Sequence, residues 1–345
     1  MGYSWKAIWN YTFLSETDTE VIPNLINYYY ENSSEENLDD KIKFLSAVVK
    51  ATKDLKGSYA IEVLSSLYPD CMVVVRKDSP LVIGKGLNEC YISSDIPAIL
   101  SFTKDFYLLN DKEFAFITRD AIEFYNENLQ EIQKDIRNIT WDAGAAEKDG
   151  FEDFMLKEIF EQPKSIRETI GSRLPKDSNS VIEDLNLSKE YLESLKKIFI
   201  VACGTAMHAG LTAKGIIENL CEIPVEVYAA SEFRYRNPII NEKTLCIFIS
   251  QSGETADTIA ALKKAKFYGC KTIAISNVIG SSITRESDYT IYTHAGPEIA
   301  VASTKAYTSQ ITVLTLLAIH FAEILETCGS ELLQTLKDEI LELKS

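Results

Sequence analysis

The sequence has few basic residues, few histidines and no paired cysteine motif. Among its 345 residues, 35 Lys and Arg stand against 51 Asp and Glu, which gives a formal net charge of −16. This charge opposes binding to nucleic acid or to an anionic membrane, because both need a basic face. Three histidines argue against a histidine-based metal site. Neither a metal nor a cofactor is predicted.

Paired thiols and long apolar runs are also lacking. Seven cysteines show no CxxC pair and no metal-ligand spacing, so reduced core thiols and a cytoplasmic location are expected. The first residues, Met1 to Lys6, lack the apolar segment of a signal peptide. The longest apolar stretch, Ile311 to Leu325, is interrupted by His320 and Glu323, which favours a buried helix over a membrane span.

The composition that remains is that of an ordinary globular protein, with 46% hydrophobic and 25% charged residues. The length suggests about two domains. In residues 1–135, two amphipathic helices at about 21–29 and 38–55 precede several short strand-like segments between 59 and 125. Turn residues separate these segments, so an antiparallel sheet is predicted.

The next part of the chain, residues 126–190, becomes polar and has a helical pattern. We expect an irregular break at Trp141–Gly144, a short helix or turn at 155–163, and another at 166–174. Residues 136–190 are interpreted as a connector between domains.

Strands and helices alternate from residue 191 onward. The predicted strands are Ile198–Ala202, Val225–Tyr228, Leu245–Ile249, Thr272–Ile275 and Tyr289–Tyr292. This rhythm predicts an α/β domain with a mostly parallel, doubly wound sheet and helices on both faces. Such sheets bind ligands beyond the carboxyl ends of their strands.

One loop at that edge is especially polar. The apolar strand Leu245–Ile249 is followed by Ser250-Gln251-Ser252-Gly253-Glu254-Thr255 and then by a helical pattern. A strand, a polar glycine turn and a helix N-terminus together can hold a phosphate through backbone N–H groups and hydroxyls. The loop lacks GxxxxGK, so nucleotide hydrolysis is not suggested. The alternative is an ordinary turn in which Ser252 caps the helix.

Three other loops at the same edge carry glycine and hydroxyl residues. They are Cys203-Gly204-Thr205-Ala206, the segment from Asn277 to Ser282, and Ala302-Ser303-Thr304-Lys305. Together the four loops favour a phosphorylated sugar over turn chemistry alone. Lys305 is interpreted as a solvated or ion-paired surface residue, and Glu254 as a favourable charge at the N-terminus of its own helix. Neither His208 nor His294 is predicted to be a catalytic base.

These segments resemble the glutamine–fructose-6-phosphate aminotransferase family. The matching stretches are Cys203–Thr205, Ala230–Arg236, Ser250–Asp257 and Val301–Ala306, and upstream Ser15–Ile22, Ser79–Gly84 and Lys157–Pro163. The resemblance runs from about Tyr11 to the end of the chain. It implies the C-terminal portion of an αββα N-terminal-nucleophile glutaminase domain in residues 1–135, the connector 136–190, and a flavodoxin-like sugar-isomerase (SIS) domain in residues 191–345.

The family makes glucosamine 6-phosphate and glutamate from fructose 6-phosphate and glutamine. By motif, the resemblance implies that Asp18 holds the α-amino group of glutamine. The residues implied for the sugar phosphate are Thr205, Ser250, Gln251, Ser252 and Thr255, with Val301 and Ser303 lining the sugar. Ala206 stands where the family often has a serine, which removes one hydroxyl contact.

Other parts of the family pattern are not found. The family's glutaminase begins with a processed cysteine nucleophile, whereas residue 2 here is Gly and no cysteine precedes Cys71. The family's acid–base Glu and His and its Schiff-base Lys belong to a second SIS domain beyond the equivalent of Ser345. We therefore expect an internal fragment with an incomplete glutamine site and no catalytic residue of its own.

Three interpretations remain open at this point. In the first, the chain is part of an aminotransferase from a truncated or split gene and is completed by other fragments. In the second, it is a non-catalytic sugar-phosphate sensor or interaction protein. In the third, its glutaminase half is too incomplete to fold and leaves open sheet edges. A homodimer through the SIS domain, or assembly with complementing fragments, is expected. Poor order is expected in residues 1–14.

Overall fold

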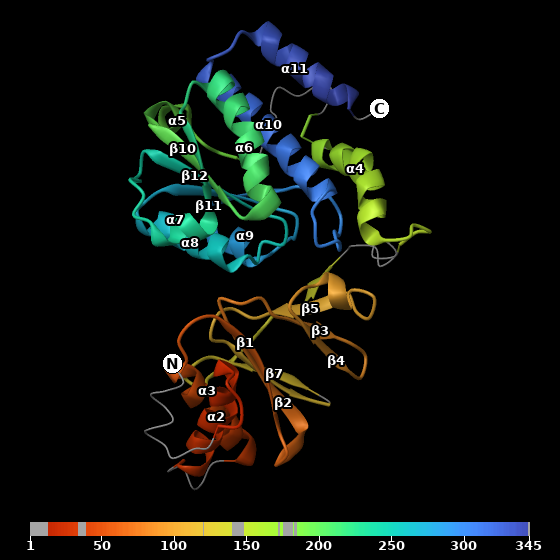
Figure 1. The fold of residues 1–345 in the computed structure, drawn as a ribbon, viewed down its shortest axis with the longest axis vertical. Helices are drawn as coiled ribbons and strands as arrows, with labels where there is room; N and C mark the ends of the chain where they lie inside the picture. Colours follow the sequence, from red (N-terminus) through yellow and green to blue (C-terminus); the bar gives the residue numbers. More distant parts are fainter. Residues whose placement is uncertain are drawn as a thin grey trace. The chain divides into compact units, whose positions relative to one another are not determined.

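The computed structural model describes residues 13–33, 39–119, 121–139, 148–171, 173–174, 182 and 185–343. The chain forms two compact units, Met1–Thr140 and Trp141–Ser345 (Figure 1). The expectations for residues 1–12 and for the Trp141–Gly144 break lie outside the described residues.

The first unit contains helices and two antiparallel sheets. Its helices are η1 (Asp18–Glu20), α2 (Val21–Glu31), α3 (Asp40–Asp54) and η2 (Pro97–Ile99). One sheet has the order β1-β2-β6-β7-β8, with β1 (Tyr59–Ser65), β2 (Tyr68–Lys77), β6 (Phe114–Thr118), β7 (Ile122–Tyr125) and β8 (Glu131–Ile132). The other has the order β4-β3-β5-β9, with β3 (Val82–Lys85), β4 (Cys90–Ser93), β5 (Asp105–Leu108) and β9 (Arg137–Asn138). The predicted antiparallel sheet is confirmed.

Strand β2 shows how the layers of this unit are built. Successive side chains of a strand point to opposite faces. Val73 and Val75 pack in one cluster with residues of α2 and α3, such as Leu45. Val74 packs in another cluster with residues of the second sheet, such as Ile83. The unit is therefore a layer of helices, a first sheet and a second sheet, each pair separated by a core.

Residues 126–139 are not helical, contrary to expectation. They contribute β8, which pairs with β7, and β9, which pairs with β5. Each is a two-residue strand at the end of its sheet. Edge positions keep one side toward solvent, so the polar composition that resembled a solvated helix also fits short edge strands.

The second unit is built on one parallel sheet in the order β11-β10-β12-β13-β14. Its strands are β10 (Lys197–Ala202), β11 (Val225–Ala229), β12 (Thr244–Ser250), β13 (Lys271–Ser276) and β14 (Tyr289–Tyr292). Its helices are α4 (Phe154–Ile170), α5 (Lys189–Ser194), α6 (Gly204–Cys221), α7 (Ala230–Tyr235), α8 (Ala256–Phe267), α9 (Ser282–Glu286), α10 (Lys305–Leu325) and α11 (Ser330–Glu342). The predicted doubly wound parallel sheet is confirmed.

Helices cover both faces of this sheet. On one face, Ile198 and Ile200 of β10 pack in a cluster with α6 and α10. On the other face, Phe199 and Val201 of the same strand pack with α7, α8 and α9. The apolar run Ile198–Ala202 within β10 is the expected result of burial on both faces.

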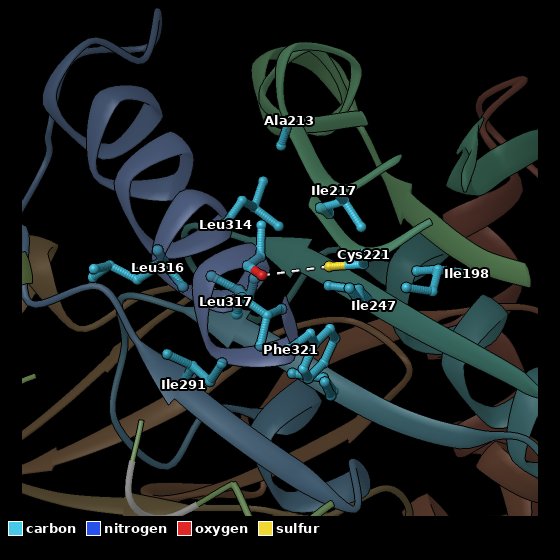
Figure 2. Packing of buried hydrophobic residues seen from close by; sticks show 14 of the residues in the cluster. Ile198, Ala213, Ile217, Cys221, Ile247, Ile291, Leu314, Leu316, Leu317 and Phe321 are labelled. Carbon is cyan, nitrogen blue, oxygen red and sulfur yellow. Dashed lines mark hydrogen bonds between the residues drawn. The ribbon is translucent and has the colours of Figure 1, made fainter. Parts of the chain in front are cut away.

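Helix α10 is the central helix of the first of these faces. By length and by a mean hydropathy of 1.5 it would be able to cross a membrane, but 61% of that apolar window is buried inside the unit. Figure 2 shows Leu314, Leu317 and Phe321 of α10 against Ile217 and Cys221 of α6 and the sheet below them. The prediction of a buried helix over residues 311–325 is therefore confirmed.

Helix α4 is one continuous helix where two short helices or turns were predicted. It begins after Asp153, whose side chain accepts a hydrogen bond from Leu156 N at 2.8 Å, and it contains Pro163. Proline lacks the N–H that would donate to the carbonyl four residues earlier. The side-chain amide of Gln162 donates to that carbonyl, Ile159 O, at 3.0 Å. This local bond reduces the cost of proline within the helix.

A close approach of α6 to the sheet at Gly210 gives a first testable prediction. A Cβ at this position would lie 2.7 Å from Ile200 Cγ2 and 3.3 Å from Val227 Cγ1. We expect Gly210→Ala to destabilise the unit by roughly 1–2 kcal/mol, because overpacking outweighs the gain in helix propensity. Gly215→Ala, at an exposed position of the same helix with nothing within 4 Å, should stabilise it by up to about 1 kcal/mol. Equal shifts in thermal unfolding would contradict the close approach.

Candidate functional site

The strand order places two helix N-termini at one point of the sheet edge. Strand β10 is followed by α6, which returns to β11, whereas the neighbouring β12 is followed by α8, which returns to β13. The two connections therefore leave in opposite directions, on opposite faces of the sheet. This is the topological switch point at which doubly wound sheets bind ligands.

The loop after β12 is organised around the buried hydroxyl of Ser250. Ser250 Oγ accepts a hydrogen bond from Gly253 N at 3.0 Å and lies 3.0 Å from Thr255 Oγ1. Ser252 Oγ accepts from Glu254 N at 3.2 Å. These short-range bonds fold residues 250–255, the predicted phosphate-binding segment, into a tight turn.

Contacts from the β13–α9 connection hold this turn in place. Asn277 N donates to Gln251 O at 3.1 Å, and Ile283 N donates to Gly253 O at 3.0 Å. Glu254 Oε1 accepts a hydrogen bond from Ser282 N, the first residue of α9, at 2.7 Å. Glu254 therefore contacts the N-terminus of α9 rather than only its own helix. A turn fixed by its neighbours is preorganised for a ligand.

Neither helix at the switch point has a side-chain cap. The N-cap residue of α6 is Cys203 and that of α8 is Thr255, and neither side chain bonds to a first-turn N–H. Ser252 is thus not the N-cap of α8, contrary to the alternative considered above. First-turn N–H groups need acceptors, and an anion can supply them. Thr205 lies in the first turn of α6 with an exposed side chain.

The loop before α10 carries the two residues predicted to line the sugar. Val301 is fully exposed. Ser303 Oγ donates to Glu298 Oε2 at 2.8 Å, and Glu298 Oε1 accepts from Thr304 N at 2.9 Å and Ala306 N at 3.1 Å. Glu298 therefore caps α10, and the Ser303 hydroxyl already has a partner within the loop.

Asn277 connects this loop to the carboxyl end of β13. Its Oδ1 accepts from Thr293 Oγ1 at 3.0 Å and Ala295 N at 2.8 Å, and its Nδ2 donates to Gly296 O at 2.6 Å. Between these residues, desolvation and the nearby Arg173 guanidinium lower the pKa of His294 from its ordinary value. This shift favours the neutral form of the His294 imidazole.

Lys305 is not a surface residue, contrary to expectation. Its side chain is buried, and Nζ lies 2.5 Å from Glu161 Oε2 of α4. Lys157, also buried, lies 3.7 Å from the other oxygen of the same carboxylate. Lys305 is thus part of a buried charge cluster between α4 and α10, and its charge is already engaged there.

Asp18 lies in the first unit. It is exposed in η1 and borders a cavity of about 170 Å³ that is also lined by Ile22, Leu25, Asp54 and Tyr59. A cavity this small accommodates only a small ligand. Across the described residues of both units, no group of three or more His, Cys, Asp or Glu side chains is placed to hold a metal ion.

Two carboxylates that shape the site were not predicted from the sequence. Glu298 is four residues beyond His294 in an irregular segment, and Glu158 of α4 contacts the same segment from 141 positions away in the chain. The repeated hydroxyl-rich loops predicted the place of the candidate site, but no local pattern indicates which distant side chains support those loops.

Comparisons with known proteins agree with the fold. A family model described as SIS domain matches residues 191–320. The chain is 52% identical over 339 residues to a glutamine–fructose-6-phosphate aminotransferase [isomerizing] of Clostridium tetani, covering 98% of this chain and 54% of that protein. It is 45% identical over 313 residues to the protein of the same name from Methanosarcina acetivorans, covering 90% and 50%.

Among solved structures, the chain is similar to the C-terminal domain of glucosamine-fructose-6-phosphate aminotransferase from Francisella tularensis. The TM-score is 0.55 with 40% identity, over 57% of this chain and 56% of that one. The chain spans about half the length of the curated relatives that it matches. It therefore contains an SIS domain and is homologous, over nearly all of its own length and about half of theirs, to the glutamine–fructose-6-phosphate aminotransferases.

Proposed function

We propose that the second unit binds a hexose 6-phosphate at its switch point and that the chain acts as part of a glutamine–fructose-6-phosphate aminotransferase. The observation that carries this proposal is the pair of uncapped helix N-termini beside the hydroxyl-rich turn. The phosphate-binding residues are proposed to be Thr205, Ser250, Gln251, Ser252 and Thr255.

Phosphate binding at this place relies on dipoles rather than on side-chain cations. The one lysine of these loops, Lys305, is engaged by Glu161. Backbone N–H groups and the helix dipoles of α6 and α8 supply the positive potential. This arrangement suits a chain of net charge −16, in which long-range steering does not favour anions.

The sugar is proposed to lie against Val301 and Ser303. The Ser303 hydroxyl, which now donates to Glu298, can instead exchange this partner for a sugar hydroxyl, since a hydroxyl both donates and accepts. In the reaction of the whole enzyme, ammonia from glutamine is transferred to the bound ketose phosphate. Asp18, at the small cavity of the first unit, is proposed to hold the α-amino group of glutamine.

The proposed location of this activity is the cytoplasm. The chain is proposed to form a homodimer through the SIS domain or to assemble with complementing polypeptides. The proposed domains are the C-terminal portion of a glutaminase domain over residues 1–135, a connector over 136–190 and the SIS domain over 191–345. A non-catalytic sugar-phosphate sensor would use the same binding residues, so the binding test below applies to both.

Calorimetric titration with glucosamine 6-phosphate tests the proposed site. We expect Ser252→Ala and Thr255→Ala each to weaken binding by roughly 10- to 100-fold, because each removes a hydrogen bond to a charged group. Thr335→Ala, at an exposed position of helix α11, is the control and should bind as the unmodified chain does. Undiminished binding in both site variants would disprove the assignment.

A further inference from the structure

The loop that carries Val301 and Ser303 is held by a carboxylate from a distant helix. Glu158 of α4 is buried, and its Oε1 accepts hydrogen bonds from Ile299 N at 2.6 Å and Ala300 N at 3.1 Å. Resting on the proposed function, we infer that Glu158 is a positioning residue that shapes the sugar side of the site and leaves the phosphate side unaffected.

Two carboxylates together fix the path of this loop. Glu158 holds the backbone just before Val301, and Glu298 holds it just after, through Thr304 N and Ala306 N. Val301 and Ala302, between the two anchors, are exposed. The direction in which these residues project is therefore set by the positions of the two carboxylates.

Helix α4 is itself firmly attached on both sides of the loop. Thr169 Oγ1 donates to Thr293 O at 2.6 Å, just before the loop. At the other end, Glu161 pairs with Lys305, the first residue of α10, at 2.5 Å. The helix therefore gives Glu158 a fixed position relative to the start and the end of the loop. Side chains locked in this way hold a site more accurately than loop residues alone.

The proposed phosphate-binding turn, residues 250–255, does not depend on the contacts made by Glu158 and the rest of α4. Residues 250–255 are held by their own hydroxyls and by N–H groups of Asn277, Ser282 and Ile283. None of the described hydrogen bonds of that turn comes from α4. Loss of Glu158 is therefore expected to change recognition of the sugar while inorganic phosphate binding is retained.

The chemistry of Glu158 also predicts which of its variants retains more sugar recognition. One oxygen accepts from two backbone N–H groups, and the other has no hydrogen-bond partner among the described residues. Glutamine keeps a side-chain oxygen that accepts from both N–H groups, whereas alanine leaves two partly buried donors without that acceptor. Glu158→Gln should thus retain more sugar recognition than Glu158→Ala.

The test compares two ligands on the full chain by calorimetric titration. Glu158→Ala should weaken binding of glucosamine 6-phosphate about tenfold or more and leave binding of inorganic phosphate within about twofold, with Glu158→Gln in between. Ser252→Ala should weaken both ligands. Ser165→Ala is the matched control, because this buried residue of α4 contacts Lys305 O and Ser309 Oγ of α10 and not the backbone of residues 299–304.

The possible outcomes separate the two proposals. Unchanged affinity of Glu158→Ala for glucosamine 6-phosphate overturns the positioning role while the proposed function stands. If Glu158→Ala and Ser165→Ala both lose affinity for both ligands, the positioning role is also overturned, because Glu158 then contributes only to the general stability of the unit. Failure of the unmodified chain to bind either ligand overturns the proposed function and this inference together.

Discussion

Gly253→Ala is expected to destabilise the second unit by roughly 3 kcal/mol or more and to abolish phosphate binding. Gly253 has a φ of +68°, in the left-handed region that costs an L side chain about 1–2 kcal/mol. An added Cβ would also lie 2.0 Å from Ser281 Oγ and 2.5 Å from Ser281 Cβ. Because Ser281 is buried, the turn itself has to move, with an overpacking cost of a further 1–3 kcal/mol or so.

A matched glycine separates the two contributions. Gly269 has a φ of +79°, but a Cβ added there would have nothing within 4 Å, so Gly269→Ala carries the backbone cost alone. We expect the loss for Gly253→Ala to exceed that for Gly269→Ala by at least about 1 kcal/mol. Hydrogen exchange of the β10 and β12 amides measures both losses within this unit. Equal losses, with phosphate binding retained by Gly253→Ala, would show that the turn has room to adapt.

The elements of the second unit could be predicted because their signals are local. Each strand is a short, largely apolar run, and the proposed phosphate-binding turn, residues 250–255, is one contiguous polar segment between a strand and a helix. Gly253 and Ser250 are three residues apart, so their contact follows from the local turn. The same reasoning predicted the antiparallel strands of the first unit, although the turn-forming residues Pro69 and Asp70 lie within β2 rather than at its boundary.

The features that could not be predicted depend on distant residues or on a local hydrogen bond that offsets the effect of a helix-breaking residue. Pro163 predicted a break in α4, but Gln162 satisfies the carbonyl that the proline leaves without a donor. Residues 126–139 contain two short edge strands within irregular structure, and a polar composition does not distinguish this arrangement from a solvated helix. The contacts of Glu158 and Lys305 span more than 140 positions in the chain, and only tertiary packing brings those partners together.

Lys305→Met is expected to destabilise the second unit by roughly 3 kcal/mol, a cost typical of breaking a buried ion pair. The Lys305 side chain is 4% exposed and that of Glu161 is 23% exposed, so neither charge is well solvated. Methionine fills a similar volume but leaves Glu161 with Lys157 at 3.7 Å as its nearest cation. For the surface lysine that the sequence suggested, the same change would cost about 0.5 kcal/mol or less.

A second substitution distinguishes loss of the ion pair from loss of packing. In Lys305→Met with Glu161→Gln, no partly buried carboxylate is left without its partner, so about 1–3 kcal/mol should be recovered relative to the sum of the single variants. Denaturant unfolding of the four proteins gives this coupling energy directly. Strict additivity would assign the cost of Lys305→Met to packing alone. A positive coupling would instead show that the Lys305–Glu161 ion pair joins α4 to the first turn of α10, beside the loop that carries Val301 and Ser303.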